Sequence, residues 1–122
     1  MLRIISLFFG LALFTFSTSA QSSCEQIMEK SDEIKELVVE SITSNNTYEI
    51  ERYLSEALEL MNETMDLVSD CDCDGVYAQL EDMIGETKWA IESKEWEEQR
   101  EIAEKLEDWC YDLKRKAKKC GK

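Results

Sequence analysis

Cysteine spacing constrains the fold of this 122-residue chain more than any other feature. Cys24 and Cys71 are 47 positions apart, and Cys73 and Cys120 have the same separation. A shift of 49 residues places the first pair on the second. A bond between Cys71 and Cys73 would need a strained ring across a single residue. The spacing therefore predicts the disulfides Cys24–Cys71 and Cys73–Cys120, each closing a unit of the same length.

Four segments carry apolar residues at the spacing of an amphipathic helix. In chain order the apolar positions are Ile27, Met28, Ile34, Leu37, Val38 and Ile42; Ile50, Tyr53, Leu54, Ala57, Leu60, Met61 and Val68; Val76, Tyr77, Leu80, Met83, Ile84, Ala90 and Ile91; and Ile102, Ala103, Leu106, Trp109, Leu113 and Ala117. The chain has no proline and is rich in helix formers. The pattern predicts an all-α fold.

Each cysteine pair encloses two of these helices, which predicts two antiparallel helical hairpins, residues 24–71 and 73–120. In such a hairpin the start of the first helix lies beside the end of the second, where two cysteines can meet. The shared cysteine spacing and the apolar columns that recur after about 49 residues indicate an internal duplication. Two arrangements remain open: a closed four-helix bundle, or a short helical-repeat stack with a groove between helices.

The connections between helices are short and polar. Residues 43–47 predict the first hairpin turn, with Asn46 as an N-cap and Glu49 as its partner three positions later. A weaker break near Ser93 predicts the second turn, although the last two segments could also form one bent helix. Residues 70–75 predict the link between the hairpins.

Residues 1–20 have the order of a secretory signal peptide. A short basic start precedes an apolar run from Ile4 to Phe16, and the small or hydroxylated residues Thr18 and Ala20 occupy the −3 and −1 positions. The apolar run is shorter than the ~20 residues of a membrane-spanning helix, which disfavours an uncleaved anchor. We expect residues 21–122 to be a single helical domain, secreted or periplasmic, where disulfides persist.

Charge and histidine content exclude several functions. The net charge is −13, and all 27 acidic residues precede Lys114. An acidic body repels nucleic acid and anionic membranes, so neither is an expected partner. The basic end, residues 114–119, complements the dipole of the last helix or docks on a polyanion or anionic lipid. The absence of histidine excludes Ser-His and Cys-His nucleophile pairs and His-ligated zinc.

The link between the hairpins also contains the strongest motif. The run Asp70-Cys-Asp72-Cys-Asp74-Gly, with Glu81 six positions after the glycine, resembles the calcium loop of EF-hand proteins over 12 residues. The resemblance implies that these four acidic side chains and the Val76 carbonyl bind Ca²⁺.

The helical phase of the following segment opposes this resemblance. Val76, Tyr77, Leu80, Met83 and Ile84 can share one core only if a helix has begun by about Gly75, whereas an EF-hand loop keeps residues 70–78 irregular. We therefore expect a helix from Gly75 onward and weak or no calcium binding. The alternative to the EF-hand loop is an acidic turn in which Asp72 or Asp74 caps that helix.

The fifth cysteine, Cys110, falls on the apolar stripe of the last helix. Two interpretations stay open: a buried free thiol that packs as a small apolar side chain, or an intermolecular disulfide that forms a homodimer.

The remaining features suggest binding or structure and not catalysis. The carboxylate pairs lie in acidic runs with no sign of a pocket. Trp89, Trp96 and Trp109 are expected to pack in the core or at a hairpin end. Asn45 and Asn62 begin glycosylation sequons. We expect a secreted, non-enzymatic helical protein that has no cofactor and binds an unidentified protein or peptide. The alternative is a calcium-binding module.

Overall fold

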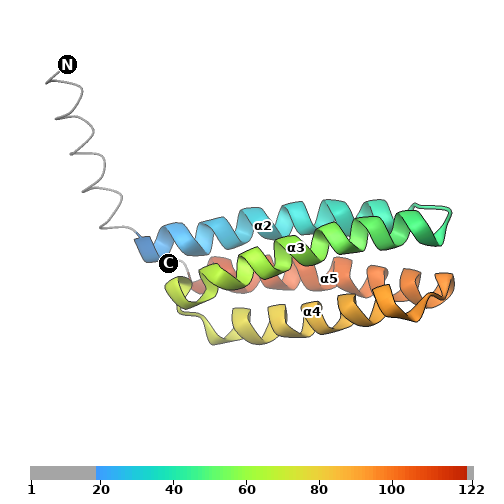
Figure 1. The fold of residues 1–122 in the computed structure, drawn as a ribbon. Helices are drawn as coiled ribbons and strands as arrows, with labels where there is room; N and C mark the ends of the chain where they lie inside the picture. The colour runs from blue at the N-terminus through green and yellow to red at the C-terminus, as the bar shows by residue number, and fades with distance from the viewer. Residues whose placement is uncertain (1–18, 121–122) are drawn as a thin grey trace, which may run out of the picture.

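The computed structural model describes residues 19–120, which form four helices and no strand. The helices are α2 (Ser19–Ile42), α3 (Thr47–Cys71), α4 (Asp74–Ser93) and α5 (Trp96–Cys120) (Figure 1). The predicted all-α fold of two disulfide-stapled hairpins is confirmed. The predicted signal peptide lies outside the described residues except for Ser19 and Ala20. No helix in the described range is both long and apolar enough to cross a membrane.

At each hairpin turn, one helix ends and the next begins near the residues that the sequence indicates. Asn46 is the N-cap of α3, and its side chain accepts a hydrogen bond of 2.8 Å from the backbone N–H of Glu49. In the second hairpin α4 ends at Ser93, and Lys94 adopts a left-handed conformation with φ 62°. That residue reverses the chain, so α4 and α5 are separate helices and not one bent helix.

The link between the hairpins is only two residues long. Asp72 is left-handed, with φ 56°, and its N–H donates to the Val68 carbonyl at 2.9 Å, which ends α3. Cys73 is the N-cap of α4 and makes no side-chain capping bond. The expectation that Asp72 or Asp74 caps this helix is therefore wrong, because Asp72 closes α3 and Asp74 is already helical. The expected helix from Gly75 onward is confirmed.

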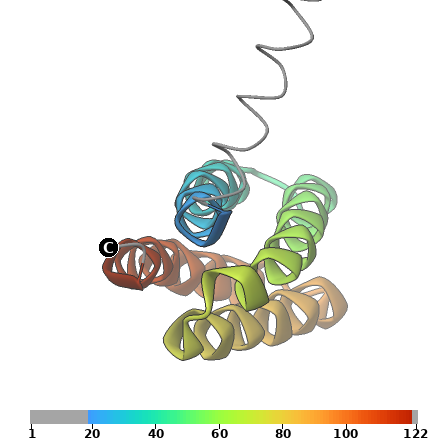
Figure 2. The same ribbon diagram turned by 90° about the vertical axis from the view of Figure 1, so that its left-hand side faces the viewer.

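The four helices close into a bundle. In the end-on view α2 lies beside α3 and α5, and α4 lies beside the same two helices (Figure 2). The contact between α2 and α5 joins the first and last helices, so the hairpins form a closed bundle and not an open stack. Both hairpin turns lie at one end of the bundle, and the link lies at the other (Figure 1). The two disulfides join helix ends on the side of the link.

Burial in one hairpin recurs 49 residues later in the other. The bounds of α3, shifted by 49, are those of α5. The buried pairs are Cys24/Cys73, Ile27/Val76, Ser31/Leu80, Ile34/Met83, Val38/Thr87, Ser41/Ala90, Ile50/Gln99, Leu54/Ala103, Ala57/Leu106, Met61/Cys110, Thr64/Leu113 and Val68/Ala117. We call two residues 49 positions apart in the two hairpins matched positions.

Several buried side chains are polar, and most of them make a local hydrogen bond. The hydroxyls of Ser31, Thr64 and Thr87 donate to the backbone carbonyl one turn earlier at 2.6–2.8 Å. The amide nitrogen of Gln99 donates to the Ala90 carbonyl at 3.1 Å across the second turn. These bonds offset much of the cost of burying polar groups, whereas the buried Gln99 Oε1 atom has no partner among the described residues.

Candidate functional site: the outer face of α4

The predicted disulfides form at the link end of the bundle. Cys24 bonds to Cys71 with a Cα–Cα distance of 4.9 Å, and Cys73 bonds to Cys120 with a Cα–Cα distance of 6.0 Å. The predicted pairing is therefore confirmed. Because Cys71 and Cys73 are separated only by Asp72, the two bonds hold all four helix ends at the link.

The residues of the EF-hand-like segment lie on three different pieces of backbone. Asp70 belongs to the last turn of α3, Asp72 forms the link, and Asp74 and Glu81 belong to α4. Val76 is fully buried within α4, and its N–H donates to the Cys73 carbonyl. Among residues 19–120 no three Asp, Glu, Cys or His side chains lie close enough to hold one metal ion. The structure therefore does not bring the proposed calcium ligands together.

Cys110 is a free thiol inside the bundle. It is 2% exposed and lies between Leu106 and Leu113 on the buried side of α5. Burial raises the pKa of this thiol from 9.0 to about 12. A thiolate is the reactive form of cysteine, so burial makes Cys110 a poor nucleophile. The position favours a packed thiol, and an intermolecular bond there would require α5 to move away from the core.

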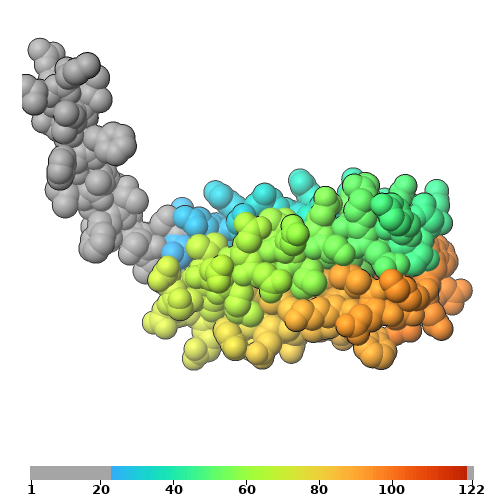
Figure 3. Space-filling view, viewed as in Figure 1, coloured from blue at the N-terminus to red at the C-terminus, as the bar shows by residue number. Residues whose placement is uncertain are grey.

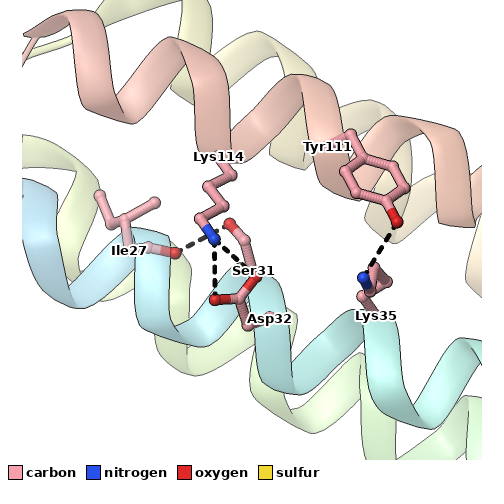
Figure 4. A network of polar contacts seen from close by, with 6 residues as sticks. All are labelled: Ile27, Ser31, Asp32, Lys35, Tyr111 and Lys114. Atoms are coloured by element: carbon pink, nitrogen blue, oxygen red, sulfur yellow. Dashed lines mark hydrogen bonds and ion pairs between the residues drawn. The ribbon is translucent and has the colours of Figure 1, made fainter.

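The basic end of α5 makes polar contacts with neighbouring helices. Lys114 donates to the Asp32 carboxylate of α2 at 3.0 Å, and one turn away Lys35 of α2 donates to the Tyr111 hydroxyl at 3.0 Å (Figure 4). The Tyr111 bond raises the pKa of Lys35. Lys116 donates to the Gln79 side chain at 2.7 Å. These contacts support the interpretation that the basic end complements its acidic neighbours.

Two large aromatic side chains lie on the solvent side of α4. Tyr77 is 49% exposed and Trp89 is 57% exposed. The sequence-based expectation placed Tyr77 in the core, which is wrong. It placed Trp89 in the core or at a hairpin end; Trp89 lies outside the core, one turn before the end of α4, and bonds to Glu98 across the turn. Glu81 and Gly85 lie between them at steps of four residues, so the four form one row along the helix. We call this row, with its neighbours Ala78, Asp82 and Lys88, the α4 face.

Gly85 has no structural role within the described part of the chain. It lies in the middle of α4 and is exposed, and a Cβ atom added to it would meet no atom within 4 Å. Glycine in a helix interior costs about 1 kcal/mol relative to alanine. Gly85 therefore lowers the stability of α4, and packing within the described residues does not explain why glycine occupies this position.

The matched face of α2 shows what the fold alone requires at these positions. Where α4 has Ala78, Asp82, Gly85 and Trp89, α2 has four carboxylates at the matched positions, and all are exposed: Glu29, Glu33, Glu36 and Glu40. Charged side chains suit a surface that only water covers. The α4 face is thus less charged than the matched face on the other hairpin, although both helices pack against α3 and α5.

Local contacts orient the two aromatic rings without covering them. The Tyr77 hydroxyl donates to Glu81 one turn along at 3.3 Å, and the Trp89 indole N–H donates to Glu98 of α5 at 2.5 Å. A hollow of about 260 Å³ lies beside Tyr77, with Met65 and Val68 of α3 on its wall. In the space-filling view α4 forms the lower edge of the molecule (Figure 3). The α4 face is therefore an oriented, partly apolar surface.

Reasoning from the sequence missed this surface because the apolar stripe of α4 was counted by residue type. The signal that could have found it is the pair of matched sequences, in which α4 departs from the acidic outer face of α2. No known family model, curated protein or solved structure matches this chain significantly. The α4 face is the feature on which we base a function.

Proposed function

We propose that this chain is a secreted, non-catalytic binding protein that presents the α4 face to a protein partner. The observation that carries the proposal is the row Tyr77–Glu81–Gly85–Trp89, which exposes two aromatic rings around a glycine for which the fold has no use. Aromatic side chains are enriched where proteins meet, and glycine permits close approach of a second backbone. A bundle stapled at one end by two disulfides gives this surface a rigid support.

The two disulfides support secretion, because such bonds persist in oxidising compartments. Burial raises the pKa of Cys110 to about 12, which withholds the thiolate that cysteine-based catalysis would need. The matched burial pattern further supports the inference that the two hairpins arose by duplication, after which only the second acquired the binding face.

Site-specific photo-cross-linking tests the proposal. A photoreactive phenylalanine analogue replaces Ala78 on the α4 face in one variant, and Glu29 at the matched position on α2 in the control. Both positions are exposed. With the protein secreted from its own cells, we expect protein adducts from position 78 and few from position 29. Equal labelling, or none at position 78, would contradict the proposal.

A further inference from the structure

The charged residues of the α4 face are arranged around Gly85 in an order that suits one kind of protein partner. Lys88 lies three residues after Gly85, and Asp82 lies three residues before it. Trp89 and Glu81 are likewise four residues to either side. When two copies of one helix cross antiparallel at a shared residue, each position after the crossing lies level along the axis with the position equally far before it in the other copy. Lys88 of each copy would then lie level with Asp82 of the other copy, across the contact and within reach of the long lysine side chain.

We propose that the α4 face binds a second copy of this chain, with the two α4 helices antiparallel and crossing at Gly85. This inference rests on the proposed function and names the partner of that surface. At the crossing, the two glycines let the backbones approach closely. About 4.5 Å along the axis on each side, Lys88 of one copy meets Asp82 of the other. One turn from the crossing, Trp89 of one copy packs over the Glu81–Tyr77 row of the other.

Charge complementarity favours this occupant. Lys88 and Asp82 are exposed, and neither has an ion-pair partner among the described residues. They are six residues apart on one helix, which is too far round the axis for a pair within the chain. The outer face of α2 carries Glu29, Glu33, Glu36 and Glu40 in the same region, so two copies repel there. Of the two matched faces, only that of α4 is complementary to itself.

The location of Cys110 points the same way. A dimer of this protein cannot use that thiol while the core is packed, because the thiol is 2% exposed. The α4 face needs no rearrangement, since its residues are exposed already. A dimer through the α4 face would therefore not depend on Cys110.

Sedimentation equilibrium of residues 21–122 over a range of protein concentrations tests the proposal. We expect the wild type and Cys110→Ala to show the same monomer–dimer equilibrium. Trp89→Glu and Gly85→Glu, which install the residues found at the matched positions of α2, should each raise the dimer dissociation constant at least about tenfold, since buried Trp anchors interfaces. Glu36→Gln on α2 is the control and should change nothing.

A charge exchange makes the test specific for antiparallel pairing. Lys88→Asp and Asp82→Lys should each weaken the dimer, because each leaves two like charges facing at the crossing. The double variant should restore it, because the two charges again face opposites. All variants are at exposed positions, and thermal unfolding at low concentration checks that the bundle is intact.

A wild-type chain that stays monomeric, or a dimer that ignores these substitutions, would overturn the proposal. So would a dimer that disappears in Cys110→Ala, because that result assigns the contact to Cys110 while both intrachain disulfides stay intact. Cross-linking at position 78 distinguishes a failure of the proposed dimer from a failure of the proposed binding role. An adduct of two identical chains supports the dimer, an adduct with a different protein overturns the dimer but keeps the binding role, and no adduct overturns both.

Discussion

Gly85 in α4 and Glu36 in α2 occupy matched positions, 49 residues apart, and both are exposed at the middle of the first helix of a hairpin. The same place in the fold thus carries the poorest non-proline helix former in one hairpin and a good one in the other. The effects of these two residues on the free energy of unfolding can be compared directly, because neither residue packs in the core.

Substitutions at these two positions should change the free energy of unfolding in opposite directions. Gly85→Ala adds a Cβ where no atom lies within 4 Å, so we expect the free energy of unfolding to rise by about 1 kcal/mol. Glu36→Gly should lower it by about the same amount. Denaturant unfolding at low protein concentration measures both. A loss of stability in Gly85→Ala would mean that the glycine is needed inside the monomer, against the role proposed for the α4 face.

The two disulfides should contribute equally to stability. Each joins residues 47 positions apart, so each removes a similar chain entropy from the unfolded state. Replacing both cysteines of either bond with alanine should lower the free energy of unfolding by about 2–4 kcal/mol. Thermal and denaturant unfolding of the two double variants, with the reduced wild type as reference, measures the loss. An unchanged melting temperature after full reduction would contradict this expectation.

Cys110 should make the protein less stable at high pH. Its pKa is raised from 9.0 to about 12 by burial, so above pH 9 the unfolded chain loses a proton that the folded chain keeps. Stability from this group is complete below pH 9 and falls as the pH rises toward 12, by at most about 1.4 kcal/mol per pH unit. Comparing the pH dependence of unfolding in wild type and Cys110→Ala isolates the effect.

The same burial predicts slow labelling of the thiol. A disulfide reagent should react with native Cys110 at a rate that follows the unfolding equilibrium, and at once in denaturant. Rapid labelling of the native protein at pH 7 would show that the thiol is accessible, and would reopen the intermolecular disulfide that the sequence allowed.

Calcium should leave the protein unchanged. Asp70, Asp72, Asp74 and Glu81 do not form a group around one point in the described structure, and Val76 is committed to the core. We expect the same melting temperature with Ca²⁺ and with EGTA, and no binding heat in isothermal titration. Micromolar binding that Asp70→Ala or Glu81→Gln removes would instead support the EF-hand resemblance.

Local rules and the cysteine spacing predicted most of the fold. Asn46 caps α3 because its side chain reaches an N–H three residues later, which is a contact within a single turn. The pairing of Cys24 with Cys71 followed from the length of one hairpin. The closure of α2 onto α5 could not be predicted in this way, because it depends on contacts such as Asp32–Lys114, which join residues 82 positions apart.

The candidate site was harder to predict than the fold. Tyr77 lies at the margin of the apolar stripe, where a small rotation of the helix decides between core and solvent, so residue type alone assigned it wrongly. Gln99 and Thr87 show the opposite error, since both are fully buried although neither is apolar. Gly85 could not be assigned to a binding surface from the sequence, because its exposure depends on how the four helices pack together.

The arrangement of the two disulfides has a consequence for how the chain responds to proteolysis. Residues 24–71 form one covalent ring and residues 73–120 form another, and the rings meet at Asp72. A protease that nicks either turn, or any helix between its paired cysteines, leaves every fragment tethered through sulfur. Only cleavage beside Asp72 separates the hairpins, and the Asp72 N–H is held there by the last turn of α3. The chain can therefore be cut once in nearly any place and remain one molecule.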